Sequence, residues 1–203
     1  MSKTTIPAGG IADDAISEEH IDATVITGST ALAATPADTD ELLISDAGTI
    51  KRVDYSYIKG ADNTPAFQAT AGTTAQTLSN NTFTKINLGT EIFDTASAFG
   101  SNKFTVPSGE SGKYSFTYGI AVPNMDDHEA VEVKLYKNGS AVDNTHVIRR
   151  ATGGSQLVFA QSTQILNLSA SDYIELYGQH GEGSSQDTNY SHVFLSGYKL
   201  AGV

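Results

Sequence analysis

The sequence contains no cysteine and no tryptophan, and it carries little positive charge. Without cysteine the chain has no disulfides, no thiolate metal ligands and no cysteine nucleophile. Lysine and arginine number 12 against 23 aspartates and glutamates, which gives a formal charge of −11. This balance argues against a nucleic-acid-binding protein, because neutralising phosphates requires clustered basic residues. It also argues against attraction to an anionic membrane surface.

Long apolar runs are missing as well. No stretch reaches the roughly 18 residues of a membrane span, and residues 1–7 contain no apolar core of the signal-peptide type. The chain is instead rich in threonine, serine and glycine, while 39% of its residues are apolar. This composition is typical of short strands and turns. We therefore expect an all-β protein that is made in a cytoplasm, without secretion, and inserts into no membrane.

The first 54 residues contain no aromatic side chain, whereas 15 of the 17 phenylalanines and tyrosines lie after residue 60. Aromatic residues supply much of the buried area of a small core. Residues 1–60 are therefore not expected to fold alone, and we interpret them as an N-terminal arm for docking and trimerisation. We expect its first part to be mostly extended, with at most a short helical turn after Ser17.

Isoleucines recur every five residues in this arm, a spacing that matches neither a helix nor a strand. The residues that we assign to docking are Ile11, Ile16, Ile21 and Ile26. Further along the arm, residues 41–53 have the pattern of a β-hairpin. Two strand-like runs flank the loop Asp46-Ala47-Gly48, in which glycine can take the left-handed conformation that such a loop needs.

Residues 65–203 show one strand pattern after another and predict a head domain. In residues 114–122, five large side chains alternate with small ones, which is typical of a strand with one buried face. The dipeptide Asn138-Gly139 is the strongest short-range signal for a hairpin turn. About eight to ten such antiparallel strands, with no helical period between them, indicate a sandwich or a barrel.

Five segments of this region resemble, in the same order, the complement globular-head domain, a relative of the tumour necrosis factor jelly roll. These segments are 65–69, 103–116, 135–139, 168–176 and 194–198. The residues that carry the pattern, and that we expect to define the fold, are Phe104, Gly112, Tyr114, Phe116, Asn138, Gly139, Asp172, Phe194 and Gly197. Ser171 replaces the family's usual glycine. The resemblance implies a homotrimeric jelly-roll sandwich, with Tyr136 and Tyr177 as candidates for the trimer axis.

The arm resembles different proteins. Residues 11–16 look like the short Ile/Ala/Asp/Gly repeats of bacteriophage fibre proteins, and residues 36–56 are similar to hairpin modules that precede such jelly rolls in phage virion proteins. The resemblance implies a structural protein on the virion surface, with other virion proteins as partners. One version is a tail fibre or spike that binds a host-surface glycan. The other is a capsid decoration or head-fibre protein.

Signals for chemistry are weak. Asp126, Asp127 and Glu129 form the one compact acidic cluster, a weak candidate for a metal site because its spacing matches no known ligand loop. The alternative function is a glycan-degrading enzyme that uses paired carboxylates, for which Asp172 and Glu175 would also be available. No serine-hydrolase elbow is present, and we expect neither a cofactor nor enzymatic activity.

Overall fold

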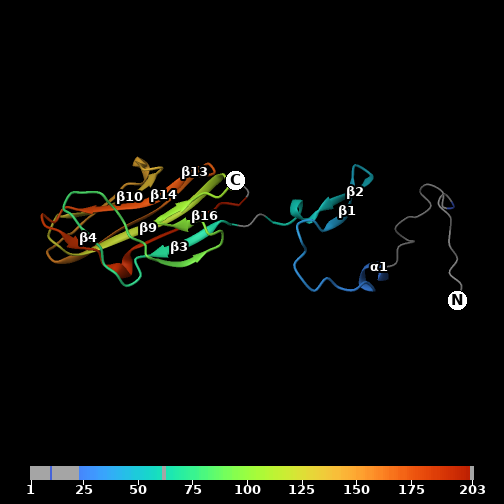
Figure 1. Ribbon diagram of the computed structural model, residues 1–203, viewed down its shortest axis with the longest axis horizontal. Coiled ribbons are helices and arrows are strands. Elements are labelled where there is room, and N and C mark those ends of the chain that lie inside the picture. The colour runs from blue at the N-terminus through green and yellow to red at the C-terminus, as the bar shows by residue number, and fades with distance from the viewer. Residues whose placement is uncertain (1–9, 11–22, 61–62, 202–203) are drawn as a thin grey trace. The chain divides into compact units, whose positions relative to one another are not determined.

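The computed structural model describes residues 10, 23–60 and 63–201 (Figure 1). The chain divides into two compact units between residues 60 and 61. Nearly all the regular structure is β in both units. None of the helices in the described part of the chain has the length and hydrophobicity to span a bilayer.

In its described residues, the first unit contains a short α-helix, a β-hairpin and a 3-10 turn. Its elements are α1 (Thr24–Thr27), β1 (Glu41–Asp46), β2 (Thr49–Asp54) and the 3-10 turn η2 (Tyr55–Tyr57). Ile26 lies on α1 and is 80% exposed. The other three isoleucines assigned to docking, and the helical turn expected after Ser17, lie outside the described residues.

The hairpin loop is one residue shorter than the sequence predicts. Asp46 pairs with Thr49, so that only Ala47 and Gly48 remain in the loop. Both have positive φ, 50° and 80°, as a type I′ turn requires. The expected three-residue loop was wrong because Ala47 adopts a left-handed conformation that is uncommon for a residue with a Cβ atom.

The second unit is a jelly roll of antiparallel strands in two main sheets, as the sequence predicts. The first sheet has the order β11-β10-β14-β8-β7, with β12 beside β10 and β5 beside β14, and the second has the order β13-β9-β16-β3-β6. Figure 1 shows β10 and β14 in one layer and β9, β16 and β3 in the other. A separate pair, β15-β4, completes the unit.

The strands of the first sheet are β5 (Thr84–Lys85), β7 (Phe99–Gly100), β8 (Lys103–Thr105), β10 (Ala130–Lys137), β11 (Ser140–Ala141), β12 (Val147–Arg150) and β14 (Tyr173–His180). Those of the second sheet are β3 (Ala66–Thr70), β6 (Thr90–Asp94), β9 (Gly112–Met125), β13 (Gln156–Leu168) and β16 (Phe194–Lys199). The remaining elements are β4 (Thr77–Leu78), β15 (Gln186–Asp187), η3 (Asp143–Thr145) and η4 (Tyr190–His192).

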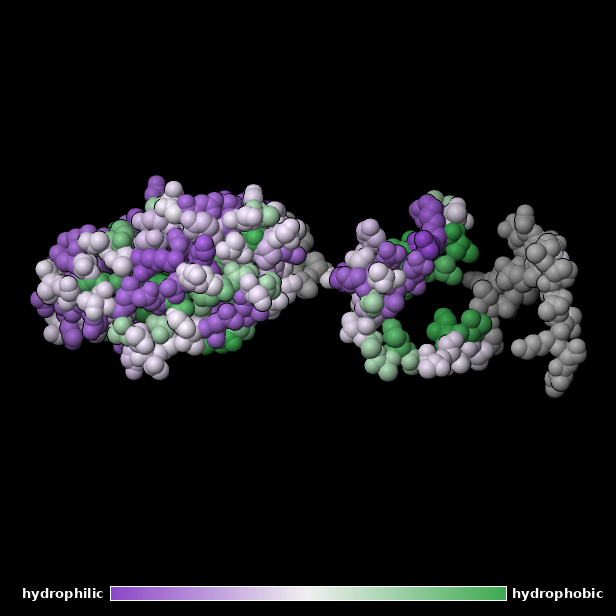
Figure 2. Space-filling model, viewed as in Figure 1, coloured by the Kyte–Doolittle hydropathy of each residue, from purple (hydrophilic) through white to green (hydrophobic). Residues whose placement is uncertain are grey.

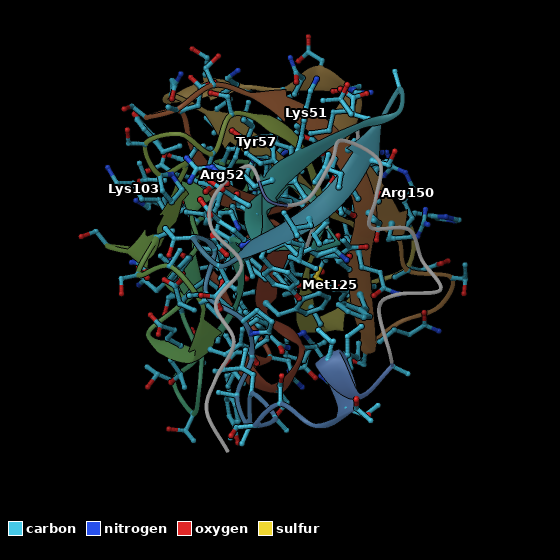
Figure 3. All side chains as sticks on the ribbon, turned by 90° about the vertical axis from the view of Figure 1, so that its right-hand side faces the viewer. Lys51, Arg52, Tyr57, Lys103, Met125 and Arg150 are labelled. Atoms are coloured by element: carbon cyan, nitrogen blue, oxygen red, sulfur yellow. The ribbon has the colours of Figure 1, made fainter. Side chains whose placement is uncertain are left out.

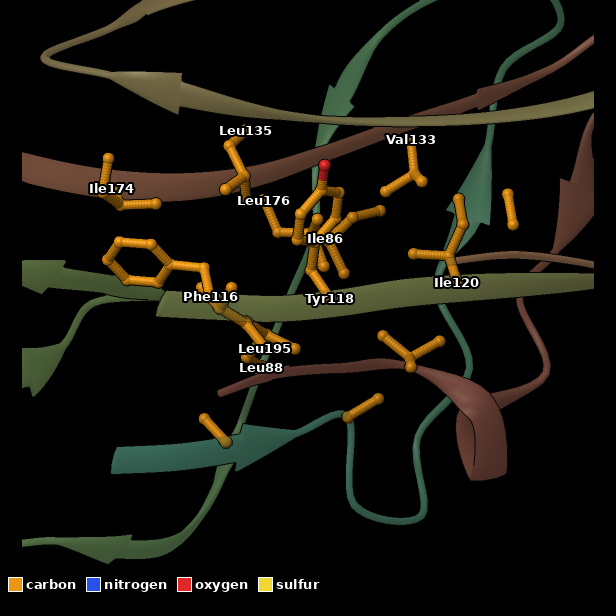
Figure 4. Close-up of a cluster of buried hydrophobic side chains, with 14 of the residues drawn as sticks. Ile86, Leu88, Phe116, Tyr118, Ile120, Val133, Leu135, Ile174, Leu176 and Leu195 are labelled. Atoms are coloured by element: carbon orange, nitrogen blue, oxygen red, sulfur yellow. The ribbon is translucent and has the colours of Figure 1, made fainter. Parts of the chain in front are cut away.

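The core lies between the two main sheets. Figure 4 shows side chains of β9, among them Phe116, pointing toward Leu135 and Leu176 in the opposite layer. At one end of the core, Phe67 and Phe104 come from different sheets and stack with ring centroids 4.7 Å apart. Each fully buried aromatic side chain contributes about 1.5–3 kcal/mol by leaving water, so this cluster accounts for the folding of the second unit.

Strand β9 is buried on both faces, although its sequence predicts one buried face. The small residues Ser115, Gly119 and Ala121 are buried beneath their neighbours on the outer side. A Cβ atom on Gly119 would lie 2.8 Å from the ring of Phe159. The missing side chain therefore makes room for an aromatic ring on the adjacent strand β13.

Candidate functional site

The outer side of the second sheet is a broad surface that carries Lys113 at the start of β9 and is otherwise without charge, and we call the part beyond Lys113 the uncharged face. The pairing register aligns the residues of this face in four rows across β13, β9, β16, β3 and β6. The first row is Ile165, Ser115, Tyr198 and Ala66, and the second is Thr163, Thr117, Ser196, Gln68 and Phe93. The third row is Gln161, Gly119, Phe194, Thr70 and Thr90, and the fourth is Phe159 and Ala121. None of these residues is acidic, basic or histidine. In a chain of formal charge −11, the lack of charge makes this face the candidate contact surface.

Large apolar side chains on this face are open to solvent. Ile165 is 57% exposed, Phe93 45% and Tyr198 41%. Phe159 and Phe194 cover the middle of the face and pack on one another, with ring centroids 6.3 Å apart. Threonine, serine and glutamine residues lie between these apolar side chains, so that the face is uncharged and partly apolar.

The outer side of the first sheet has the opposite character, and we call it the charged face. On β10 and β14, polar and aromatic residues alternate there with the buried core residues. The residues of this face are Phe83, Lys85, Glu132, Lys134, Tyr136, His146, Glu175 and Tyr177. Lys85 Nζ lies 2.6 Å from Glu175 Oε1, and His146 Nε2 lies 2.7 Å from Glu132 Oε2. Lys134 Nζ lies over the ring of Phe83, 4.0 Å from its centroid.

The candidates for the trimer axis, Tyr136 and Tyr177, lie on the charged face. Their rings stack on each other within one chain, with centroids 3.8 Å apart. Burial, followed by the nearby Glu175 carboxylate, raises the pKa of Tyr177. The sequence places these tyrosines on the faces of strands, but it does not show which of the two sheets has an outer side without charge. The uncharged face was missed for this reason.

Asp172 holds two turns together. Its Oδ1 accepts a hydrogen bond from Asn138 Nδ2 at 2.7 Å, and its Oδ2 lies 2.8 Å from both the Ser169 amide and Lys137 Nζ. Lys137, Asn138 and the Ser169 amide together lower the pKa of Asp172 from 3.8 to about 2. Ser171, which replaces the glycine of the resembling family, takes the left-handed conformation with φ 71°.

Four of the other residues expected to define the fold lie in the core or on the uncharged face. Phe104, Tyr114 and Phe116 are buried in the core, and burial followed by Glu110 raises the pKa of Tyr114 to about 12. Phe194 lies on the uncharged face.

Asn138 and Gly139 form a tight turn, and the other two glycines allow neighbouring side chains to lie close to the backbone. Asn138 and Gly139 have φ of 51° and 77° in the turn after β10. A Cβ on Gly197 would lie 2.6 Å from the Phe116 ring, and one on Gly112 would lie 3.1 Å from the Lys199 side chain.

The acidic cluster forms no metal site in the described part of the chain, where no three histidine or carboxylate side chains gather around a point that could hold an ion. Asp127 lies 3.3 Å from His128 Nε2. The Asp126 amide donates to Glu182 Oε2 at 2.8 Å. These contacts are those of a solvated turn between β9 and β10.

No model of a protein family matches the chain, and no curated protein sequence matches it either. Solved structures do match. Murine APRIL at pH 5.0 is 11% identical, with a TM-score of 0.50, over 70% of this chain and 100% of that one. Eiger TNF from S. frugiperda is 10% identical, with a TM-score of 0.50, over 70% and 96%. The globular domain of zebrafish complement 1qA protein is 12% identical, with a TM-score of 0.49, over 67% and 97%.

At such low identity, the two likenesses with a TM-score of 0.50 establish the fold alone, and the fold class expected from the sequence is confirmed. The second unit therefore has a jelly-roll fold.

Proposed function

We propose that the protein is a homotrimeric structural component on the outside of a bacteriophage particle, with the jelly roll exposed and the N-terminal arm anchoring it. The observation that carries this proposal is the uncharged face. A closed ring of identical subunits buries the same surfaces in every copy. A surface without charge can be buried in that way without leaving unpaired ions, each of which costs several kcal/mol in a dry interface.

The charged face supports the proposed orientation of the jelly roll, in which one sheet faces the trimer axis and the other faces solvent. Lys85 and Glu175 are already paired within one chain, and Lys134 lies over the Phe83 ring, so that burial against a copy would only remove the hydration of these charges. We therefore propose that it points to solvent in the trimer. The stacked Tyr136 and Tyr177 then lie on the outer surface, and the trimer axis runs beside the uncharged face.

The phage assignment is supported by the arm, whose residues 11–16 and 36–56 resemble segments of phage virion proteins. An arm of net charge −6 without aromatic residues before Tyr55 needs contacts outside itself in order to be ordered. Attachment to another virion protein would supply them. Both a capsid decoration or head fibre and a tail fibre or spike that binds a host glycan fit this arrangement.

A structural role, and not catalysis, is also supported by the carboxylates. Asp172 and Glu175, which an enzyme would need as a free pair, are each bound to a lysine, Lys137 and Lys85. The pKa of Asp172 is lowered to about 2, which keeps it ionised and unsuited to general acid catalysis at neutral pH. We propose that the protein is not an enzyme.

Two matched variants test the trimer. Gln161→Lys places a charge on the uncharged face, and Gln179→Lys places the same charge on β14 opposite Glu132, outside the uncharged face. Light scattering should give three times the chain mass of 21.3 kDa for the wild type and for Gln179→Lys, but a monomer for Gln161→Lys. A trimeric Gln161→Lys protein would show that the uncharged face is not the contact. A monomeric wild type at micromolar concentration would overturn the trimer itself.

Immunogold labelling of intact virions with an antibody against residues 65–203 tests the location. Gold on the capsid faces would identify a decoration or head-fibre protein, and gold on the tail would identify a fibre or spike. Particles that carry the protein but show no gold would contradict an exposed jelly roll.

A further inference from the structure

The hairpin of the first unit and the residues that close it, 37–59, form a small folded module, which we call the hairpin module. The Tyr55 amide donates to the Asp40 carbonyl at 2.7 Å, and the Ser56 amide donates to the Asp38 carbonyl at 3.2 Å. Lys59 Nζ lies 2.6 Å from Asp38 Oδ1. The two chain ends are thus held together, and the ladder extends beyond β1 and β2.

Large apolar side chains of this module face solvent. Tyr57 is 81% exposed, Leu43 78% and Ile50 75%, while Leu42 and Ile44 are each 42% exposed. Figure 2 shows hydrophobic residues on the surface of this unit. An isolated two-stranded hairpin is only marginally stable in water, so the module needs a partner that covers these side chains.

The apolar residues lie on both faces of the hairpin. The pairing register places Leu42, Ile44 and Val53 on one side, the first face, and Leu43 and Ile50 on the other, the second face. A flat partner, such as the surface of another protein, covers only one side of a two-stranded sheet. A rotationally symmetric ring presents two different surfaces of each copy to its two neighbours, and it therefore covers both.

The charges of the hairpin also point to a copy of itself. Lys51 and Arg52 are neighbours on β2 (Figure 3) and so lie on opposite faces. Lys51 pairs with Asp46 on the first face, and Arg52 pairs with Glu41 at 3.0 Å on the second. The first face is thereby neutralised within one chain, and Asp54 leaves the second face with one excess negative charge. Neither face carries the charge that would attract a strongly charged partner, and repulsion between copies stays small.

We propose that the hairpin module is a second self-association element, in which the first face of one copy packs on the second face of the next around a threefold axis. This inference rests on the trimer of the proposed function. Only residues 60–65 separate the module from β3, a distance of about 20 Å when fully extended. Three jelly rolls in a trimer would therefore hold three hairpins at high effective concentration.

Amide hydrogen exchange on the full-length protein tests this inference, with mass measured in parallel. We expect the amides of β1 and β2 to be protected in the wild-type trimer. Leu43→Lys on the second face and Ile44→Lys on the first should each reduce that protection at least about tenfold without changing the trimeric mass. Gln179→Lys, in β14 of the jelly roll and outside the hairpin module, is the matched control and should leave protection unchanged. Because Leu43 is so exposed in a single chain, its replacement removes little within that chain.

The outcomes separate the two proposals. A trimer whose hairpin amides exchange freely would overturn the hairpin inference and leave the trimer intact. A trimer in which only the first-face variant loses protection would mean that the hairpin packs on one surface, such as its own jelly roll, and would also overturn it. A monomeric wild type would overturn both proposals.

Discussion

Phe116 is one of the core residues through which the two sheets pack on each other. It is fully buried, its ring centroid lies 5.9 Å from that of Phe104, and it also packs against Gly197. We expect Phe116→Ala to lower the free energy of unfolding by about 3–5 kcal/mol, as other buried phenylalanine truncations do. Denaturant unfolding measures this. Ile148→Ala, at an exposed position, should change stability by less than about 0.5 kcal/mol. Equal midpoints for the two variants would contradict the burial of Phe116.

The lowered pKa of Asp172 predicts how the stability of the jelly roll changes with acid. Its folded-state pKa of about 2 lies below the ordinary 3.8, so its contribution to stability is complete above the ordinary pKa. That contribution is lost as pH falls from about 4 toward 2. Asp172→Asn should therefore be less stable than the wild type at pH 7, and the difference should shrink toward zero near pH 2. A difference that does not depend on pH would show that the ionised carboxylate is not the stabilising group.

At the scale of elements, the turn between β1 and β2 offers a stabilising change. Ala47 has φ 50° next to Gly48, and asparagine accepts this left-handed conformation better than alanine does. We expect Ala47→Asn to stabilise the hairpin by about 0.5–1 kcal/mol, which would slow amide exchange in β1 and β2 about two- to fivefold. Gly48→Ala, at φ 80°, should accelerate exchange. Faster exchange in Ala47→Asn would contradict the two-residue turn.

The elements that sequence alone predicts well are those with local signals. The alternation in residues 114–122 and the Asn138-Gly139 turn depend on neighbours within a few residues, and both are present in the structure. The pattern of residues 190–200 also predicts a strand, but β16 begins only at Phe194, because Asn189 Oδ1 accepts from the Ser191 amide and closes a turn first. Local patterns therefore located most strands but not all of their ends.

Features that depend on pairing between distant strands could not be predicted. The link from Asp172 to Asn138 joins residues 34 positions apart. The burial of Gly119 depends on Phe159 of another strand. The uncharged face appears only when five strands are aligned in register. For this reason we expected Tyr136 and Tyr177 to be contact residues from the sequence, whereas the uncharged face lies on the other sheet.

At the scale of the whole molecule, the two units should differ in resistance to protease. Residues 23–40 are exposed apart from the half-buried Pro36, whereas the jelly roll has its own core. We expect brief protease treatment of the free protein to remove much of residues 1–40 and to leave residues 65–203 intact, as mass spectrometry can show. On assembled particles the same arm should resist cleavage. Digestion of the jelly roll before the arm would contradict this division.

The uncharged face also determines how the assembly responds to ionic strength. Since that face carries none of the −11 charge of each chain, the whole excess lies on the remaining surface, and three copies brought together repel one another over the Debye length. That length falls from about 30 Å at 0.01 M to about 10 Å at 0.1 M. Added sodium chloride should therefore tighten the trimer, whereas it would loosen an interface held by ion pairs. Dilution experiments at the two concentrations measure the difference, and a trimer weakened by the salt would contradict an uncharged contact.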